Sequence, residues 1–108
     1  MLTHEHVYQA FITGLLMNVR GRYTVTAEME NGKGRYDIML KSSSSKYPNI
    51  VMELKRSDSE SSLEHDAEVA LSQIMEKDYI HGLSDDTILY GISFKGKQPF
   101  IVSKTITI

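Results

Sequence analysis

The chain has 108 residues, of which 41% are hydrophobic and 24% charged, and its formal net charge is −2. The length and composition are typical of one globular domain and argue against global disorder. The slightly negative net charge gives no overall positive electrostatic field that would indicate a nucleic-acid partner. Because there is no cysteine and no apolar run of about 20 residues, disulfides, thiolate metal sites and a membrane-spanning helix are excluded, and we expect a cytoplasmic protein.

The N-terminal part of the chain predicts an amphipathic helix over residues 3–19, with Thr3 as its N-cap. Glu5 lies at the rim of the apolar face of this helix. The apolar residues recur at helical spacing, which predicts that this face is buried: Tyr8, Phe11, Ile12, Leu15 and Val19.

Alternation of apolar and polar residues then predicts a strand over residues 22–30. Asn31-Gly32 is a strong hairpin signal, because both residues tolerate positive φ, and it returns the chain into a second strand over residues 35–41. After a serine-rich loop, residues 49–55 form a near-continuous apolar run. That run predicts a central strand covered on both faces.

A second helix is predicted over residues 61–79, where the apolar residues lie within one arc of about 100°. Residues 87–94 and 100–108 predict two further strands, and the alternation in the last one is typical of an edge strand. The predicted order is therefore α-β-β-β-α-β-β, an α/β (α+β) chain with residues 1–108 as a single domain.

Two of the predicted strands carry ionisable residues where buried strands normally carry none. Asp37 interrupts the first apolar run, and Glu53 and Lys55 interrupt the second. Glu53 and Lys55 share a face of their strand about 6–7 Å apart, and Asp37 can face the same way if the two strands pair. Burying two carboxylates and an ammonium group together is unfavourable unless they bind a cation or take part in a reaction. We therefore interpret Asp37, Glu53 and Lys55 as an active site.

Three segments carry an ordered pattern: Gly-x-Gly-Arg-x-Asp at 32–37, Glu-x-Lys at 53–55, and Ala-Leu-x-Gln-Ile-x-x-Lys-x-Tyr at 70–79. Together they resemble the PD-(D/E)XK nuclease superfamily, and more narrowly the nuclease-like domain at the C-terminal end of bacterial AAA-ATPase-like proteins. The similarity extends from about Glu5 to Phe100, although Tyr36 stands where the superfamily's name has proline. It implies a restriction-endonuclease-like fold, with a mixed central β-sheet flanked by helices.

The resemblance implies a metal-dependent nuclease whose catalytic positions match Asp37, Glu53, Lys55 and Gln73. Asp37, Glu53 and the backbone carbonyl of Leu54 would hold Mg²⁺, or Mn²⁺ in its place. Lys55 would orient or deprotonate the attacking water and offset charge in the transition state. Glu5 resembles the family's additional acidic residue beside the metal, and Glu30 competes with it for that role.

The same resemblance implies contacts with nucleic acid and with other proteins. Gln73 and Tyr79 match positions that brace the site or touch the phosphate backbone in junction-cleaving relatives, and the candidate phosphate contacts are Lys33, Arg35 and Lys77. The expected substrate is DNA, with RNA less well supported. A homodimer and an ATPase-like domain in a longer protein are the expected partners.

Two alternatives stay open. Asp37, Glu53 and Lys55 could form a structural salt bridge inside the sheet, and the domain could be a catalytically silent module that binds nucleic acid or protein. The intact set of Asp37, Glu53, Lys55 and Gln73 favours the enzyme, because a site that has lost its activity has no reason to keep the unpaired carboxylate cluster that we expect here. The low net charge favours the binding module. Asp66, near the start of the second helix, is expected to be a surface residue or a cap.

Overall fold

A computed structural model describes residues 4–30, 35–77 and 85–107 of the chain. Its elements confirm the predicted order. They are α1 (His4–Asn18), β1 (Tyr23–Glu30), β2 (Arg35–Ser42), β3 (Asn49–Arg56), the 3₁₀-helix η1 (Glu60–Ser62), α2 (Leu63–Met75), β4 (Thr87–Lys95) and β5 (Gln98–Ile106). No helix in these described ranges is long and apolar enough to cross a membrane.

The last strand begins two residues earlier than the predicted start at residue 100. Gly96, at φ 60°, and Lys97 form a two-residue turn, so that Lys95 already pairs with Gln98 across β4 and β5. A positive φ is readily adopted by glycine, and this allows the tight connection. The predicted Asn31-Gly32 turn lies outside the described residues, but β1 and β2 pair in antiparallel register from Glu30 and Arg35 onward.

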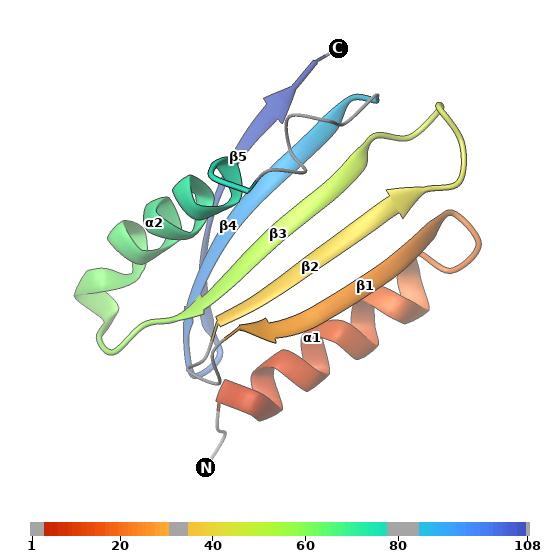
Figure 1. Cartoon of the computed structure of the whole chain (residues 1–108). Coiled ribbons are helices and arrows are strands. Elements are labelled where there is room, and N and C mark those ends of the chain that lie inside the picture. Colours follow the sequence, from red (N-terminus) through yellow and green to blue (C-terminus); the bar gives the residue numbers. More distant parts are fainter. Residues whose placement is uncertain (1–3, 31–34, 78–84, 108) are drawn as a thin grey trace.

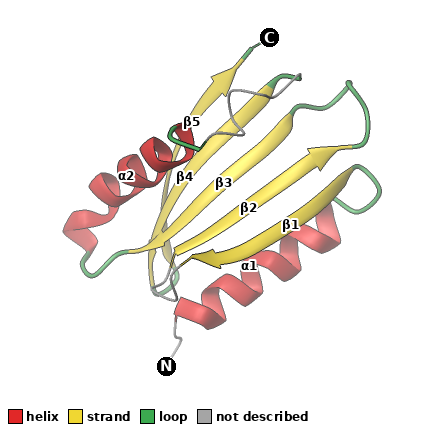
Figure 2. Cartoon of the chain, viewed as in Figure 1, coloured by secondary structure: helices red, strands yellow, loops and turns green. Residues whose placement is uncertain are grey.

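The five strands form one mixed sheet in the order β1-β2-β3-β4-β5 (Figure 1). Neighbouring strands are antiparallel except β3 and β4, which are parallel and are connected through α2. The third strand is therefore central, as its apolar run predicted, and β5 is an edge strand. Figure 2 shows this sheet with the two helices beside it.

Each helix covers one face of the sheet. On the α1 face, the predicted apolar residues of the helix pack against a buried cluster, and the ring of Tyr8 stacks on Tyr36 with centroids 3.7 Å apart. The buried residues of this cluster are Tyr36, Ile38, Leu40, Met52, Leu54, Ile92 and Phe94. On the α2 face, Val51, Ile74 and Leu89 form a smaller cluster. These two clusters assign the alternating residues of β2 and β3 to opposite faces.

Gly91 lets α2 lie directly on the sheet. A Cβ atom at this position would meet the backbone carbonyl of Ala67 and would stand 2.6 Å from the backbone nitrogen of Leu71. The start of the same helix is anchored where Ser93 donates a hydrogen bond to the carbonyl of Leu63. Because Gly91 pairs with Glu53 in the register of β3 and β4, this close contact lies beside the predicted site.

Candidate active site

Asp37 and Glu53 are direct partners across the antiparallel pair of β2 and β3. Side chains at such positions have their Cβ atoms about 4.5–5.5 Å apart. Val51, two residues before Glu53 on β3, packs against α2, so the alternation of the strand places Glu53 and Lys55 on that face as well. Asp37, Glu53 and Lys55 therefore share the α2 face of the sheet.

Glu53 is fully buried, with 0% of its surface exposed, and it is paired with Arg35. Nη2 of Arg35 donates a hydrogen bond to Oε1 of Glu53 over 3.0 Å. A buried carboxylate without a compensating charge would be strongly unfavourable, and the guanidinium supplies that charge. In this structure Arg35 thus contacts the carboxylate that the resemblance assigns to the metal.

Asp37 is paired with the ammonium group of Lys77. Nζ of Lys77, just beyond the end of α2, lies 3.1 Å from Oδ2 of Asp37, and both side chains are partly exposed. The α2 region therefore contributes a positive charge to β2. The expectation of an unpaired carboxylate cluster is wrong, because Asp37 and Glu53 each have a basic partner.

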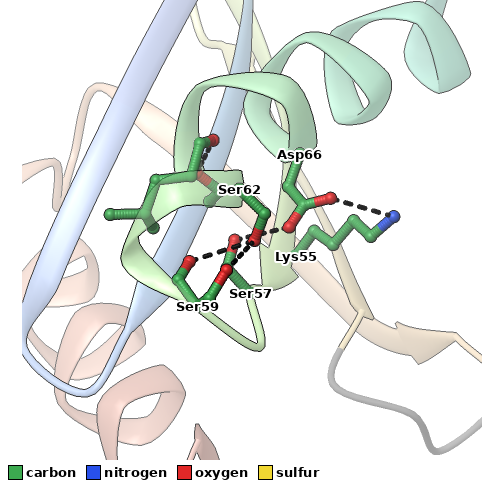
Figure 3. Close-up of polar contacts among 7 residues, drawn as sticks. Lys55, Ser57, Ser59, Ser62 and Asp66 are labelled. Atoms are coloured by element: carbon green, nitrogen blue, oxygen red, sulfur yellow. Dashed lines mark hydrogen bonds and ion pairs between the residues drawn. The ribbon is translucent and has the colours of Figure 1, made fainter.

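Lys55 is paired with Asp66 of α2, and Nζ of Lys55 lies 3.7 Å from Oδ1 of Asp66 (Figure 3). The expectation that Asp66 is a plain surface or capping residue is also wrong, because its side chain is only 15% exposed and its carboxylate contacts the side chains of Lys55 and Ser57. Burial alone would raise the pKa of Asp66. Hydrogen bonds from Ser57 and Ser62 and the nearby positive charge of Lys55 outweigh burial and lower this pKa below its ordinary value.

Two further predicted residues occupy compatible positions. Leu54 buries its side chain in the core under α1, so any contact with a cation would come from its backbone carbonyl. Gln73 is half-buried on α2, which ends at Met75, before the predicted end at residue 79. Its Oε1 is buried and accepts no hydrogen bond from the part of the chain that the structure describes.

Four predicted residues are beyond what the structure tests. Lys33 and Tyr79 lie outside the described residues. Glu5 belongs to the first turn of α1, and Glu30 pairs with Arg35 in register, but the side chains of both also lie outside the described part. The choice between Glu5 and Glu30 as the additional acidic residue stays open.

Glu28 is an acidic neighbour that the sequence reasoning missed. It stands opposite Asp37 in the register of β1 and β2, and together with Thr26 and Met39 the two residues line a hollow of about 210 Å³. The sequence alone did not give this pairing: a two-residue turn at Asn31-Gly32 would set residue 28 opposite residue 35, whereas Glu30 pairs with Arg35 and Glu28 therefore with Asp37. Among the described elements, α2 packs mainly over β3, β4 and β5 rather than over the hollow between β1 and β2.

A family model described as the PD-(D/E)XK nuclease superfamily matches residues 3–104, nearly the whole chain. The chain belongs to this superfamily. A search of the curated proteins and a search of the solved structures found no match to this chain. The mixed five-stranded sheet with a helix on each face is consistent with the restriction-endonuclease-like fold of PD-(D/E)XK nucleases, which generally use divalent metals.

The residues of the site fit a small divalent cation. Among the described residues, no three His, Cys, Asp or Glu side chains form a metal-binding group. Mg²⁺ does not require one, because it is commonly held by one or two carboxylates together with water and substrate phosphate oxygens. Asp37 and Glu53 are cross-strand partners, and their carboxylate oxygens are the ligands that Mg²⁺ and Mn²⁺ accept.

Proposed function

We propose that residues 1–108 form a single nuclease domain that hydrolyses phosphodiester bonds in DNA with the help of Mg²⁺ or Mn²⁺. The observation that carries this proposal is the register of β2 and β3. It sets Asp37 opposite Glu53 with Lys55 on the same face, in a chain of the PD-(D/E)XK nuclease superfamily. RNA is the second substrate to be tested.

In this proposal Asp37 and Glu53 hold the cation together with the backbone carbonyl of Leu54, and Glu5 is the additional acidic residue beside it. A bound divalent cation supplies charge stabilisation and a more acidic water. Lys55 orients the attacking water and offsets charge on the phosphate, and Gln73 braces the site from α2. The water oxygen bonds to phosphorus while the bond from phosphorus to one sugar oxygen breaks. One water proton ends on the released sugar hydroxyl, and the other leaves with the phosphate or to solvent.

Arg35 and Lys77 have two roles in this proposal. Both now contact carboxylate oxygens that the cation also requires, Oε1 of Glu53 and Oδ2 of Asp37. Once the cation is loaded, we expect these basic side chains to be released toward the phosphates of the substrate, because the cation replaces their charge. Lys33 and Tyr79 are proposed as further contacts with the phosphate backbone on the strength of the sequence pattern alone.

The wider context is also proposed from the resemblance. The nuclease-like domains that this sequence resembles follow an ATPase-like region, so an ATPase-like domain is a proposed partner. A homodimer is the other one, because junction-cleaving relatives act as dimers. Neither is needed for the chemistry assigned to Asp37, Glu53 and Lys55.

One observation favours a second function, a silent module that binds nucleic acid or protein. Both carboxylates are ion-paired within the chain, which is also how a structural cluster would be built. A silent module would keep these pairs permanently, whereas a nuclease must exchange them for a cation. Metal binding therefore separates the two functions.

We expect Mg²⁺ and Mn²⁺ to bind the wild-type domain and to support cleavage of DNA that stops when the cation is chelated. Asp37→Asn should weaken binding about tenfold or more, because one of two charged ligands is lost. Calorimetric titration, and a panel of branched, single-stranded and duplex DNA with RNA as comparison, measure both. Asp58→Asn is the matched control, since Asp58 is exposed and pairs with Arg56. A folded wild type that neither binds metal nor cuts any substrate would favour the silent module.

Lys55→Ala should separate the two steps of the proposed mechanism. Cleavage should fall about 10²-fold, the usual effect of removing one stabilising donor, while the affinity for Mg²⁺ stays at the wild-type value. Single-turnover cleavage and metal titration measure these quantities. Lys46→Ala, which removes an exposed lysine from the loop after β2, should change neither. Full cleavage by Lys55→Ala would contradict the role assigned to Lys55.

A further inference from the structure

The carboxylate of Asp66 has a different partner on each oxygen. Oδ1 faces Nζ of Lys55 at 3.7 Å, and Oδ2 accepts a hydrogen bond of 2.7 Å from Oγ of Ser57 (Figure 3). The side chain of Lys55 is 28% exposed and that of Asp66 15%, so solvent screens this pair less than a pair on the open surface. Oδ1 is thus available to pair with Lys55, while the hydrogen bond to Oδ2 fixes the orientation of the carboxylate.

The supports of Asp66 are themselves anchored to the sheet. Ser57 is 3% exposed, and its backbone N–H donates a hydrogen bond of 2.7 Å to the carbonyl of Phe94 on β4. The first turn of α2, which carries Asp66, is held where Ser93 donates to Leu63. Asp66 is therefore fixed to the sheet both through its side chain and through its helix.

Lys55 needs an anionic partner such as Asp66 because its side chain can also approach the carboxylate of Glu53. Its side chain has a flexible four-carbon stem, and Glu53 lies on the same face only two residues away. An ammonium group without another anion nearby would be drawn toward Glu53 and Asp37, where it would compete with the cation. An anion on α2 offers the ammonium a position away from those two carboxylates.

We propose that Asp66 is a positioning residue for Lys55. The carboxylate of Asp66 holds the ammonium group of Lys55 away from the carboxylates of Glu53 and Asp37 and beside the phosphate to be attacked. This inference rests on the proposed nuclease function. The lowered pKa of Asp66 agrees with it, because against the effect of burial the hydrogen bonds and the charge of Lys55 stabilise the ionised carboxylate. Asp66 itself is assigned no contact with the substrate or the cation.

Asp66→Asn tests the charge of this residue without removing its shape. The amide oxygen can still accept the hydrogen bond from Ser57, so the attachment of α2 should survive. We expect kcat at saturating Mg²⁺ to fall about tenfold with KM for DNA unchanged, since small displacements of a positioned group lower the rate. Mg²⁺ affinity should weaken, because the released ammonium group competes with the cation for Glu53 and Asp37. Asp66→Glu, which restores the charge, should recover part of the loss. Glu64→Gln is the matched control, because Glu64 is exposed in the same first turn of α2.

A double-mutant cycle separates positioning from a purely structural role. If Asp66 acts through Lys55, Asp66→Asn should have no further effect on the residual cleavage by Lys55→Ala. The same fractional loss in both backgrounds would overturn the inference, and so would wild-type kcat in Asp66→Asn alone.

An NMR measurement keeps the inference testable without cleavage. In metal-free protein, the ε-methylene group of Lys55 should become more mobile in Asp66→Asn but not in Glu64→Gln. If the wild type cuts no nucleic acid, the proposed function is wrong, and this comparison alone decides whether Asp66 holds Lys55. Equal mobility in the two variants would overturn the inference even if the wild type is an active nuclease.

Discussion

Glu53→Gln should lower DNA cleavage by about 10³-fold or more while the domain stays folded, because it removes a charged cation ligand from the centre of the site. Glutamine is the informative replacement. Its side-chain oxygen can still accept the hydrogen bond that Arg35 now donates to Glu53, and it fills the same fully buried volume. Alanine would break a buried ion pair and would mix a loss of stability with the loss of chemistry.

Three measurements check this result: Mg²⁺ titration, the rate of cleavage, and urea unfolding of the same preparation. Glu68→Gln is the matched control, since Glu68 is exposed on α2. Both variants should unfold close to the wild-type urea concentration, and only Glu53→Gln should lose metal binding and cleavage. Wild-type cleavage by Glu53→Gln would remove Glu53 from the mechanism and would leave its pair with Arg35 as a structural feature.

Local patterns were sufficient to predict the sheet and the face that the candidate site occupies. Residues 22–30 alternate with the period of a strand, residues 35–41 and 49–55 are short apolar runs, and these three segments form neighbouring antiparallel strands. Because side chains alternate along a strand, the sequence predicted only that Asp37 can share a face with Glu53 and Lys55 if β2 and β3 pair, and the register that sets Asp37 opposite Glu53 comes from the structure. The fold of the superfamily supplied the remaining topology.

The partners of the charged residues could not be predicted in the same way. Arg35–Glu53, Lys77–Asp37 and Lys55–Asp66 join residues from different elements, and each depends on where a side chain ends rather than on where its strand or helix runs. The pair of Lys55 and Asp66 depends on the path of the chain through η1, which turns α2 back over the sheet. Only the tertiary structure shows that a first-turn aspartate meets the lysine of the Glu-x-Lys strand.

Gly91→Ala should destabilise the domain by about 1–3 kcal/mol, which is the usual effect of overpacking a close contact. The added Cβ would meet backbone atoms of Ala67 and Leu71, which cannot rotate away as a side chain could, so α2 would have to move off β4. Because α2 carries Asp66 and leads into Lys77, this movement should also lengthen their contacts with Lys55 and Asp37. Urea unfolding measures the stability, and cleavage by the folded protein measures the effect on the site.

Gly14→Ala is the matched control for this prediction, and it should act in the opposite direction. A Cβ at Gly14 in α1 has no atom within 4 Å, and replacing a glycine inside a helix by alanine stabilises by about 0.5–1 kcal/mol. The two substitutions add the same methyl group, so the difference between them isolates the contact of α2 with the sheet. If Gly91→Ala were as stable and as active as the wild type, α2 would not lie on β4 at this distance. The positions assigned to Asp66 and Lys77 would then be wrong with it.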